Sequence, residues 1–115
     1  MDILTNYRAQ VKFAFLFGSY AAGEADKWSD IDIGIYFSKE VTDELKNKIR
    51  FEIMNQLEPF NVDIGYLDNE DIAPVIFVLA TEGIPIVIND EDTFYEERMR
   101  KIYLLEEMRL IGREK

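Results

Sequence analysis

The stretch FLFGSYAAGEADKWSDIDIGIYF, residues 15–37, decides the fold, because two apolar segments in it flank a polar loop. The first belongs to an almost continuously apolar run, residues 11–17, which predicts a central strand. The second, residues 31–37, alternates apolar residues with Asp32 and Gly34 and predicts another strand. Burying an unpaired carboxylate is strongly unfavourable, so an aspartate inside such a strand needs an explanation.

Alternation along a strand places successive side chains on opposite faces. We therefore expect Asp30 and Asp32 to share one face, with the isoleucines between and after them on the other. The segment VDIG at residues 62–65 repeats the pattern IDIG of residues 31–34. If the two strands pair, Asp63 joins the same patch, and Gly34 and Gly65 leave that face open.

Two explanations of these aspartates compete. Solvent-facing positions on a one-sided sheet would tolerate them, but Asp is depleted in strands and three carboxylates on one face would repel each other. A divalent cation would convert the repulsion into attraction. A cluster that offers only oxygen ligands suits Mg²⁺ or Mn²⁺.

The loop before these acids adds a second element. Gly18 permits a positive φ and a close backbone approach, and Ser19 offers a hydroxyl and a backbone N–H. A helical turn at residues 20–22 would direct free N–H groups toward an anion. A phosphate beside a carboxylate-bound Mg²⁺ is the arrangement that phosphoryl and nucleotidyl transfer require.

Composition narrows the chemistry further. The 115 residues, 48% hydrophobic, predict one folded domain, and the chain contains no cysteine and no histidine. Disulfides, thiolate or imidazole metal ligands, cysteine nucleophiles and Ser-His-Asp catalysis are therefore excluded. The net charge of −10 disfavours direct nucleic-acid binding. We see neither a signal peptide nor an apolar run long enough to span a membrane, and expect a cytoplasmic protein.

Charge is distributed unevenly along the chain. Residues 1–92 carry 7 basic and 18 acidic side chains, a net of −11, whereas residues 93–115 carry 6 and 5, a net of +1. The last segment is therefore a different kind of surface from the rest.

Further patterns complete the expected element order. Helix 41–58 has apolar residues at i, i+4 spacing and ends before a proline. We also expect helix 2–9, strand 61–67, helix 70–81 stopped by Gly83, strand 85–88 and helix 92–111. This order predicts the α/β (α+β) class, a mixed sheet of about four strands with helices packed on it.

Gly18-Ser19, ten intervening residues and Asp30-Ile31-Asp32 resemble the G-S-x(10)-D-x-D signature of the DNA polymerase β-like nucleotidyltransferase superfamily. The surrounding residues GSYAAG and SDIDIGI are similar to its minimal (MNT) branch, and the resemblance covers roughly residues 10–88. It implies a nucleotidyltransferase fold, a single minimal domain over residues 1–115, and ATP as substrate.

The resemblance also implies site roles. Asp30 and Asp32 would hold two Mg²⁺ ions, with Mn²⁺ as a substitute, and Asp63 would complete one metal site and help to deprotonate the acceptor hydroxyl. Gly18 and Ser19 would bind the β- and γ-phosphates. Lys27 and Arg50 could neutralise phosphate charge, or could be ordinary surface residues.

Short MNT proteins resemble the antitoxins of HEPN–MNT toxin–antitoxin pairs. The resemblance implies transfer of AMP from ATP to a tyrosine hydroxyl of a HEPN ribonuclease toxin. A binding antitoxin without catalysis is one alternative, and nucleotidylation of a small molecule such as an antibiotic is a weaker one. The helix at 92–111 could bind the partner, in a homo- or hetero-oligomer, or could simply bury a wide face; its apolar residues are Met99, Ile102, Tyr103, Leu105, Met108 and Ile111.

Overall fold

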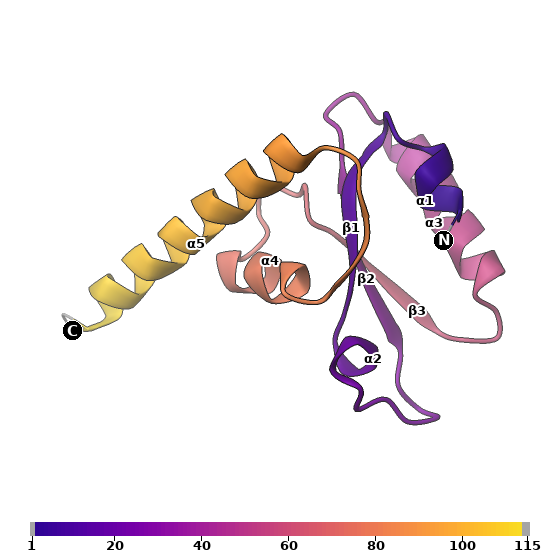
Figure 1. Cartoon of the computed structure of the whole chain (residues 1–115), viewed down its shortest axis with the longest axis horizontal. Helices are drawn as coiled ribbons and strands as arrows, with labels where there is room; N and C mark the ends of the chain where they lie inside the picture. Colours follow the sequence, from indigo (N-terminus) through magenta and orange to yellow (C-terminus); the bar gives the residue numbers. More distant parts are fainter. Residues whose placement is uncertain (1, 114–115) are drawn as a thin grey trace.

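Four strands form one mixed sheet in the order β3-β2-β1-β4, as seen in the computed structural model of the chain (Figure 1). The structure describes the backbone of residues 2–113 and side chains from residue 3 to residue 109. The strands are β1 (Val11–Phe17), β2 (Ile31–Phe37), β3 (Val62–Tyr66) and β4 (Ile84–Ile88). The helices are α1 (Asp2–Asn6), α2 (Ser19–Ala22), α3 (Asp43–Gln56), α4 (Pro74–Thr81) and α5 (Glu91–Arg113). The predicted fold class is confirmed.

The sheet combines antiparallel and parallel pairs. β1 pairs with β2 and with β4 in antiparallel register, while β2 and β3 are parallel. Parallel neighbours need a crossover connection, and α3 supplies it. The apolar β1 is central, as its sequence predicts, and the repeated IDIG and VDIG segments lie side by side.

Helices cover both faces of the sheet. α1 and α3 lie on one face, and α4 and the first turns of α5 lie on the other (Figure 1). The α3 face buries Leu4, Ile33, Ile35, Ile49 and Ile53 among others. The α4 face buries an aromatic cluster that includes Phe13, Phe15, Phe77 and Phe94. The isoleucines of β2 therefore pack away from Asp32, as alternation predicts.

Local signals explain the ends of α3 and α5. The Thr42 hydroxyl accepts a hydrogen bond from the Leu45 N–H at 3.2 Å and caps α3. Asp90 caps α5 by accepting the Thr93 N–H at 3.0 Å. Lys12 from β1 donates to the same aspartate at 3.0 Å, which ties the start of α5 to the sheet.

The predicted helix 70–81 is wrong at its start, because α4 begins only at Pro74. Proline disfavours the helical conformation for the residue before it, and Ala73 is indeed extended, so the proline occupies the first helical turn. α4 ends at Thr81, as predicted, but Gly83 does not end it through a left-handed backbone conformation. It lacks a positive φ, and its need for glycine comes from close contact with the Leu16 backbone.

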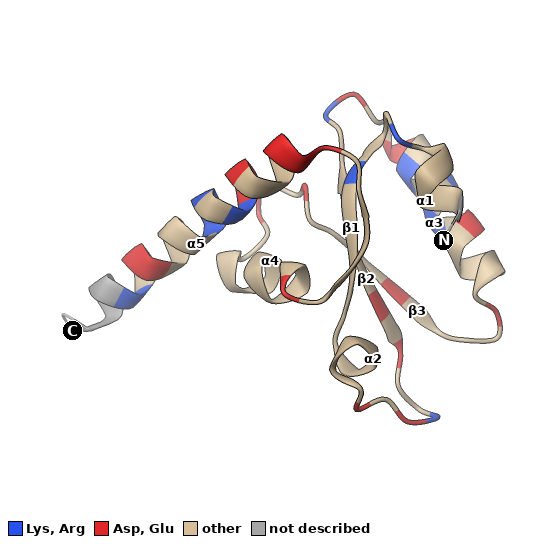
Figure 2. Cartoon of the chain, in the orientation of Figure 1, with Lys and Arg blue, Asp and Glu red and all other residues tan. Residues whose placement is uncertain are grey.

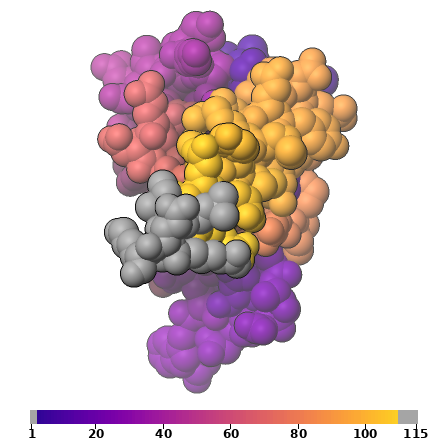
Figure 3. Space-filling model, turned by 90° about the vertical axis from the view of Figure 1, so that its left-hand side faces the viewer, coloured from indigo at the N-terminus to yellow at the C-terminus, as the bar shows by residue number. Residues whose placement is uncertain are grey.

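Other boundaries shift by a few residues. α1 ends at Asn6 rather than residue 9, because a turn follows in which Tyr7 O accepts the N–H groups of Gln10 and Val11. α5 continues to Arg113, and its C-terminal half projects from the body of the protein (Figure 1), on the side that faces the viewer in Figure 3. None of the helices within residues 2–113 combines the length and apolarity that crossing a membrane requires.

Candidate functional site

The turn from β1 into α2 brings the backbone of Gly18 against the side chain of Asp32. Gly18 has φ +74° and ψ −152°, a backbone conformation that residues other than glycine rarely adopt. A Cβ atom at this position would collide with Asp32 Oδ2. The predicted positive φ and close approach are both confirmed, and the carboxylate that approaches belongs to the predicted site.

The parallel pairing of β2 and β3 sets the positions of the carboxylates. Asp32 lies directly opposite Asp63 in the register of the two strands. Asp30 immediately precedes β2, where the Ile31 N–H still bonds to Asn61 O at 2.8 Å. The predicted pairing of the two repeated segments is therefore confirmed.

This arrangement shifts the pKa of the Asp32 carboxyl. Its pKa is raised above the ordinary value of 3.8, first by partial burial and then by the negative charges of Asp63 and Asp30. The three acids are therefore close enough to interact unfavourably when all are ionised. Such a site gains stability from a bound cation.

The donor set fits Mg²⁺ or Mn²⁺, since it offers only carboxylate oxygens. Within the described part of the chain, however, no group of three or more acidic side chains is arranged to hold a metal ion by itself. Mg²⁺ commonly completes its coordination with water and substrate phosphates rather than with an all-protein cage. The arrangement is therefore one that a phosphate-bearing substrate could complete.

The expectation that two glycines leave this face open is half correct. A Cβ atom built on Gly65 would meet nothing within 4 Å, but one on Gly34 would lie 3.0 Å from Leu67 Cδ1. Leu67 is 2% exposed and covers the face between Asp32 and Tyr36. Alternation from Asp63 through Gly65 to Leu67 would have revealed this from the sequence.

The two cations considered for phosphate binding differ in their positions. Lys27 is exposed, with its Nζ 5.1 Å from the centre of the Trp28 ring. Arg50 lines a small cavity of about 180 Å³ together with Asp63, and its Nε is buried without a hydrogen-bond partner. Arg50 is therefore the better placed of the two to neutralise phosphate charge, because it lies in the same cavity as Asp63.

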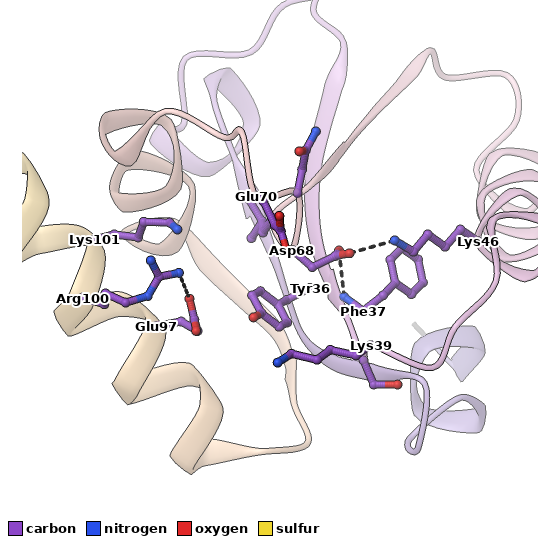
Figure 4. A pocket seen from close by; sticks show the side chains of 12 residues that line it. Tyr36, Phe37, Lys39, Lys46, Asp68, Glu70, Glu97, Arg100 and Lys101 are labelled. Carbon is purple, nitrogen blue, oxygen red and sulfur yellow. Dashed lines mark hydrogen bonds and ion pairs between the residues drawn. The ribbon is translucent and has the colours of Figure 1, made fainter.

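A larger cavity of about 510 Å³ lies beyond Leu67, at the far end of β2 (Figure 4). Two ion pairs stabilise its walls, Lys46 with Asp68 at 2.8 Å and Arg100 with Glu97 at 2.6 Å. Lys101 from α5 is only 5% exposed, and burial lowers the pKa of its ammonium. The sequence analysis missed this cavity, because its residues come from four separate segments with no common motif.

Comparison with known proteins supports the assignment of the fold. A family profile described as "Polymerase beta, Nucleotidyltransferase" matches residues 1–92. A crystal structure of a toxin–antitoxin with AMP-PNP has a TM-score of 0.75 and 17% identity, over 97% of this chain and 88% of that chain. A mutant of the toxin–antitoxin MntA-HpeT gives 0.72 and 16%, over 97% and 88%. The toxin–antitoxin MntA-HepT gives 0.67 and 13%, over 97% and 86%.

These likenesses concern the fold, since the identities are low. No curated protein matches the sequence significantly. The family profile, by contrast, covers most of the chain, including the Gly18-Ser19 turn and all three carboxylates. The chain belongs to the polymerase beta nucleotidyltransferase family.

Proposed function

We propose that this protein is a Mg²⁺-dependent nucleotidyltransferase that moves AMP from ATP to a tyrosine hydroxyl of a HEPN ribonuclease toxin, and so acts as its antitoxin in the cytoplasm. The observation that carries the proposal is the contact of Asp32 with the Gly18 turn, with Asp63 in register beside it. The likeness to toxin–antitoxin structures, one of them with AMP-PNP, supports the choice of partner and nucleotide.

Each site residue has a role in this reaction. Asp30 and Asp32 would hold two Mg²⁺ ions, and Asp63 would complete one of the two sites. The ions supply charge neutralisation at the phosphates when bound. Gly18 and Ser19 would bind the terminal phosphates through backbone N–H groups and the serine hydroxyl.

The transfer itself is an in-line displacement. The acceptor oxygen forms a bond to the α-phosphorus of ATP, and the bond to the β-phosphate oxygen breaks, which releases pyrophosphate. Asp63 would help to accept the hydroxyl proton, as the family resemblance implies, and this role suits a chain that has no histidine.

α5 supports an interaction with a partner protein. Its outer side exposes a line of large residues at roughly helical spacing, each more than half exposed: Tyr95, Met99, Tyr103 and Met108. An exposed apolar line of this kind is typical of an interaction surface. Ile111, which belongs to the predicted apolar set, lies outside the described side chains.

Mass spectrometry of the intact partner tests the proposal. The purified protein, ATP, Mg²⁺ and a purified HEPN toxin should yield a partner heavier by one AMP moiety per transfer. Asp32→Asn should abolish the gain, and so should removal of Mg²⁺ with EDTA. An unmodified partner under active conditions would contradict the proposal.

A non-catalytic antitoxin is the second candidate. The observation in its favour is the exposed apolar line on α5, which could hold a partner whether or not any AMP is transferred. A growth assay separates the two functions: Asp32→Asn should fail to rescue cells from the toxin if transfer is required, and should rescue them if binding suffices.

A further inference from the structure

We propose that the exposed face of α4 is the docking surface for the acceptor protein, whose matching surface has an apolar centre and a basic rim. This inference rests on the proposed function, since it names where the acceptor of that reaction binds. Three observations carry it: the composition of α4, its position beside the Gly18 turn, and the charge around it.

α4 has the sequence PVIFVLAT and contains no charged residue. One side of it packs into the core through Phe77 and Ala80, which are fully buried. The other side exposes Val75, Ile76 and Leu79, at 43%, 48% and 56%. A helix that is apolar all round is normally buried on all sides, so this face is expected to be covered in an assembly.

The exposed face borders the candidate transfer site. A hollow of about 270 Å³ is lined by the C-terminal end of α4 and by the α2 turn, and it includes Leu79, Ile84 and Gly18. Ile84 is itself 49% exposed and extends the apolar surface onto the edge strand. Gly18 in turn contacts Asp32. A protein seated on α4 would therefore have its nearest residues next to the carboxylates.

The charge around α4 selects the kind of partner. α4 lies within residues 51–97, which contain twelve acidic residues and no lysine or arginine, and Arg98 of α5 donates to Val78 O and Thr81 Oγ1 at the C-terminal end of α4. Exposed acids lie at both ends of α4, Glu70 and Asp71 before it and Glu82 after it, and the helix between them is uncharged (Figure 2). The ion pair nearest this rim is a loose one, with Arg98 Nη2 and Glu82 Oε1 3.8 Å apart.

Electrostatic complementarity then favours a basic partner over a second copy of this chain. Two copies joined through α4 would bring the same acidic rims together, which is destabilising. An enzyme that acts on RNA needs basic residues on its surface to bind phosphates. A ribonuclease acceptor would therefore carry the positive charge that complements this acidic rim.

Binding measurements with the same purified HEPN toxin test the docking surface separately from the transfer. All variants are made in an Asp32→Asn background, so that no transfer alters the partner. The double variant Ile76→Ser/Leu79→Ser should raise the Kd at least about tenfold, as loss of central apolar contacts does. The matched control Phe51→Ser/Phe60→Ser removes two residues that are 55% and 54% exposed but lie outside α4, and it should leave the Kd within about twofold.

A second arm tests the charge. The variant Glu70→Gln/Asp71→Asn/Glu82→Gln should slow association by about tenfold at low salt and reduce the salt dependence of the association rate. A circular dichroism spectrum that matches the spectrum of Asp32→Asn alone would show that each variant is folded.

The outcomes distinguish the two proposals. Loss of binding in the α4 variant, with no AMP on the partner of the wild-type protein, would retain the docking surface and refute the transfer. Normal binding of the α4 variant would overturn the docking surface, even if AMP is transferred. Failure of the HEPN protein to bind, or a wild-type homodimer that the α4 variant converts to a monomer, would overturn it as well.

Discussion

Asp32 and Asp63 are direct partners across the parallel pair of β2 and β3, and the negative charge of Asp63 helps to raise the pKa of Asp32. Neighbouring strands lie only about 4.8 Å apart, so two ionised carboxylates at this register position repel each other. The free protein therefore carries an unfavourable interaction that a cation would relieve.

Replacement of Asp32 by Asn should stabilise the free protein at neutral pH by roughly 0.5–1 kcal/mol. Because the folded-state pKa of Asp32 is raised, its ionisation costs stability as the pH increases from about 3.8 through the raised value. The difference in unfolding free energy between Asp32→Asn and the wild type should therefore shrink at pH values below about 3.8. Thermal unfolding at several pH values measures it.

The wild type and Asp32→Asn should also respond differently to Mg²⁺ and ATP. Mg²⁺ with ATP should raise the melting temperature of the wild type and have little effect on Asp32→Asn. Equal stabilisation of both by Mg²⁺ and ATP would show that Asp32 is not a metal ligand.

Gly18 and Gly23 form a matched pair for substitution by alanine. Both have positive φ, +74° and +72°, but only at Gly18 would the new Cβ meet Asp32, whereas at Gly23 it meets nothing within 4 Å. Gly23→Ala should cost about 1–2 kcal/mol through backbone strain alone. Gly18→Ala should cost more and reduce nucleotidyl transfer by at least about 100-fold, because it displaces Asp32. Denaturant unfolding and transfer rates measure the two effects, and equal loss of activity in both variants would exclude the Asp32 contact as its cause.

Asp90 connects the start of α5 to the sheet. The pKa of its carboxyl falls to about 2, first because it accepts the Thr93 N–H and then because Lys12 and the Thr93 hydroxyl also donate to it. Since the folded-state pKa is lowered, this stabilisation is complete above about pH 3.8 and is lost as the pH falls towards 2. Asp90→Ala should therefore cost about 1 kcal/mol at neutral pH, and much less near pH 2.

Asp90→Asn is the control for this cap. Its side chain can still accept the Thr93 N–H but lacks the negative charge that pairs with Lys12. It should lie between wild type and Asp90→Ala in urea unfolding. If Asp90→Asn loses as much unfolding free energy as Asp90→Ala, the stabilisation comes from the ion pair with Lys12 and not from the helix cap.

The parts of this protein that follow local rules could be predicted from the sequence. Alternation and apolar runs gave the bounds of β1 and β2, and the repeated IDIG and VDIG segments predicted their juxtaposition in the sheet. The start of α4 was missed because a continuous apolar pattern hid the constraint that Pro74 imposes on Ala73.

Longer-range packing could not be predicted in the same way. The cavity at the far end of β2 depends on how the start of α5 packs beside α4 and the sheet, which brings Glu97 and Lys101 opposite Tyr36. Such contacts join residues that are distant in the chain, and a single sequence carries no local pattern for them.

Lys101 provides a last test, because its burial costs stability. Its side chain is 5% exposed, its Nζ lies 5.5 Å from the centre of the Phe77 ring, and desolvation is the first cause of its lowered pKa. Lys101→Met keeps the length of the side chain and removes the buried charge, so it should stabilise the protein by about 1 kcal/mol at neutral pH. The wild type should gain stability as the pH rises through the lowered pKa towards 10.5, and the Met variant should lack this gain. The control is Lys39→Met, at an exposed lysine of the same cavity, which should leave the unfolding free energy unchanged. If Lys101→Met loses stability and Lys39→Met does not, the buried ammonium of Lys101 makes a favourable interaction instead.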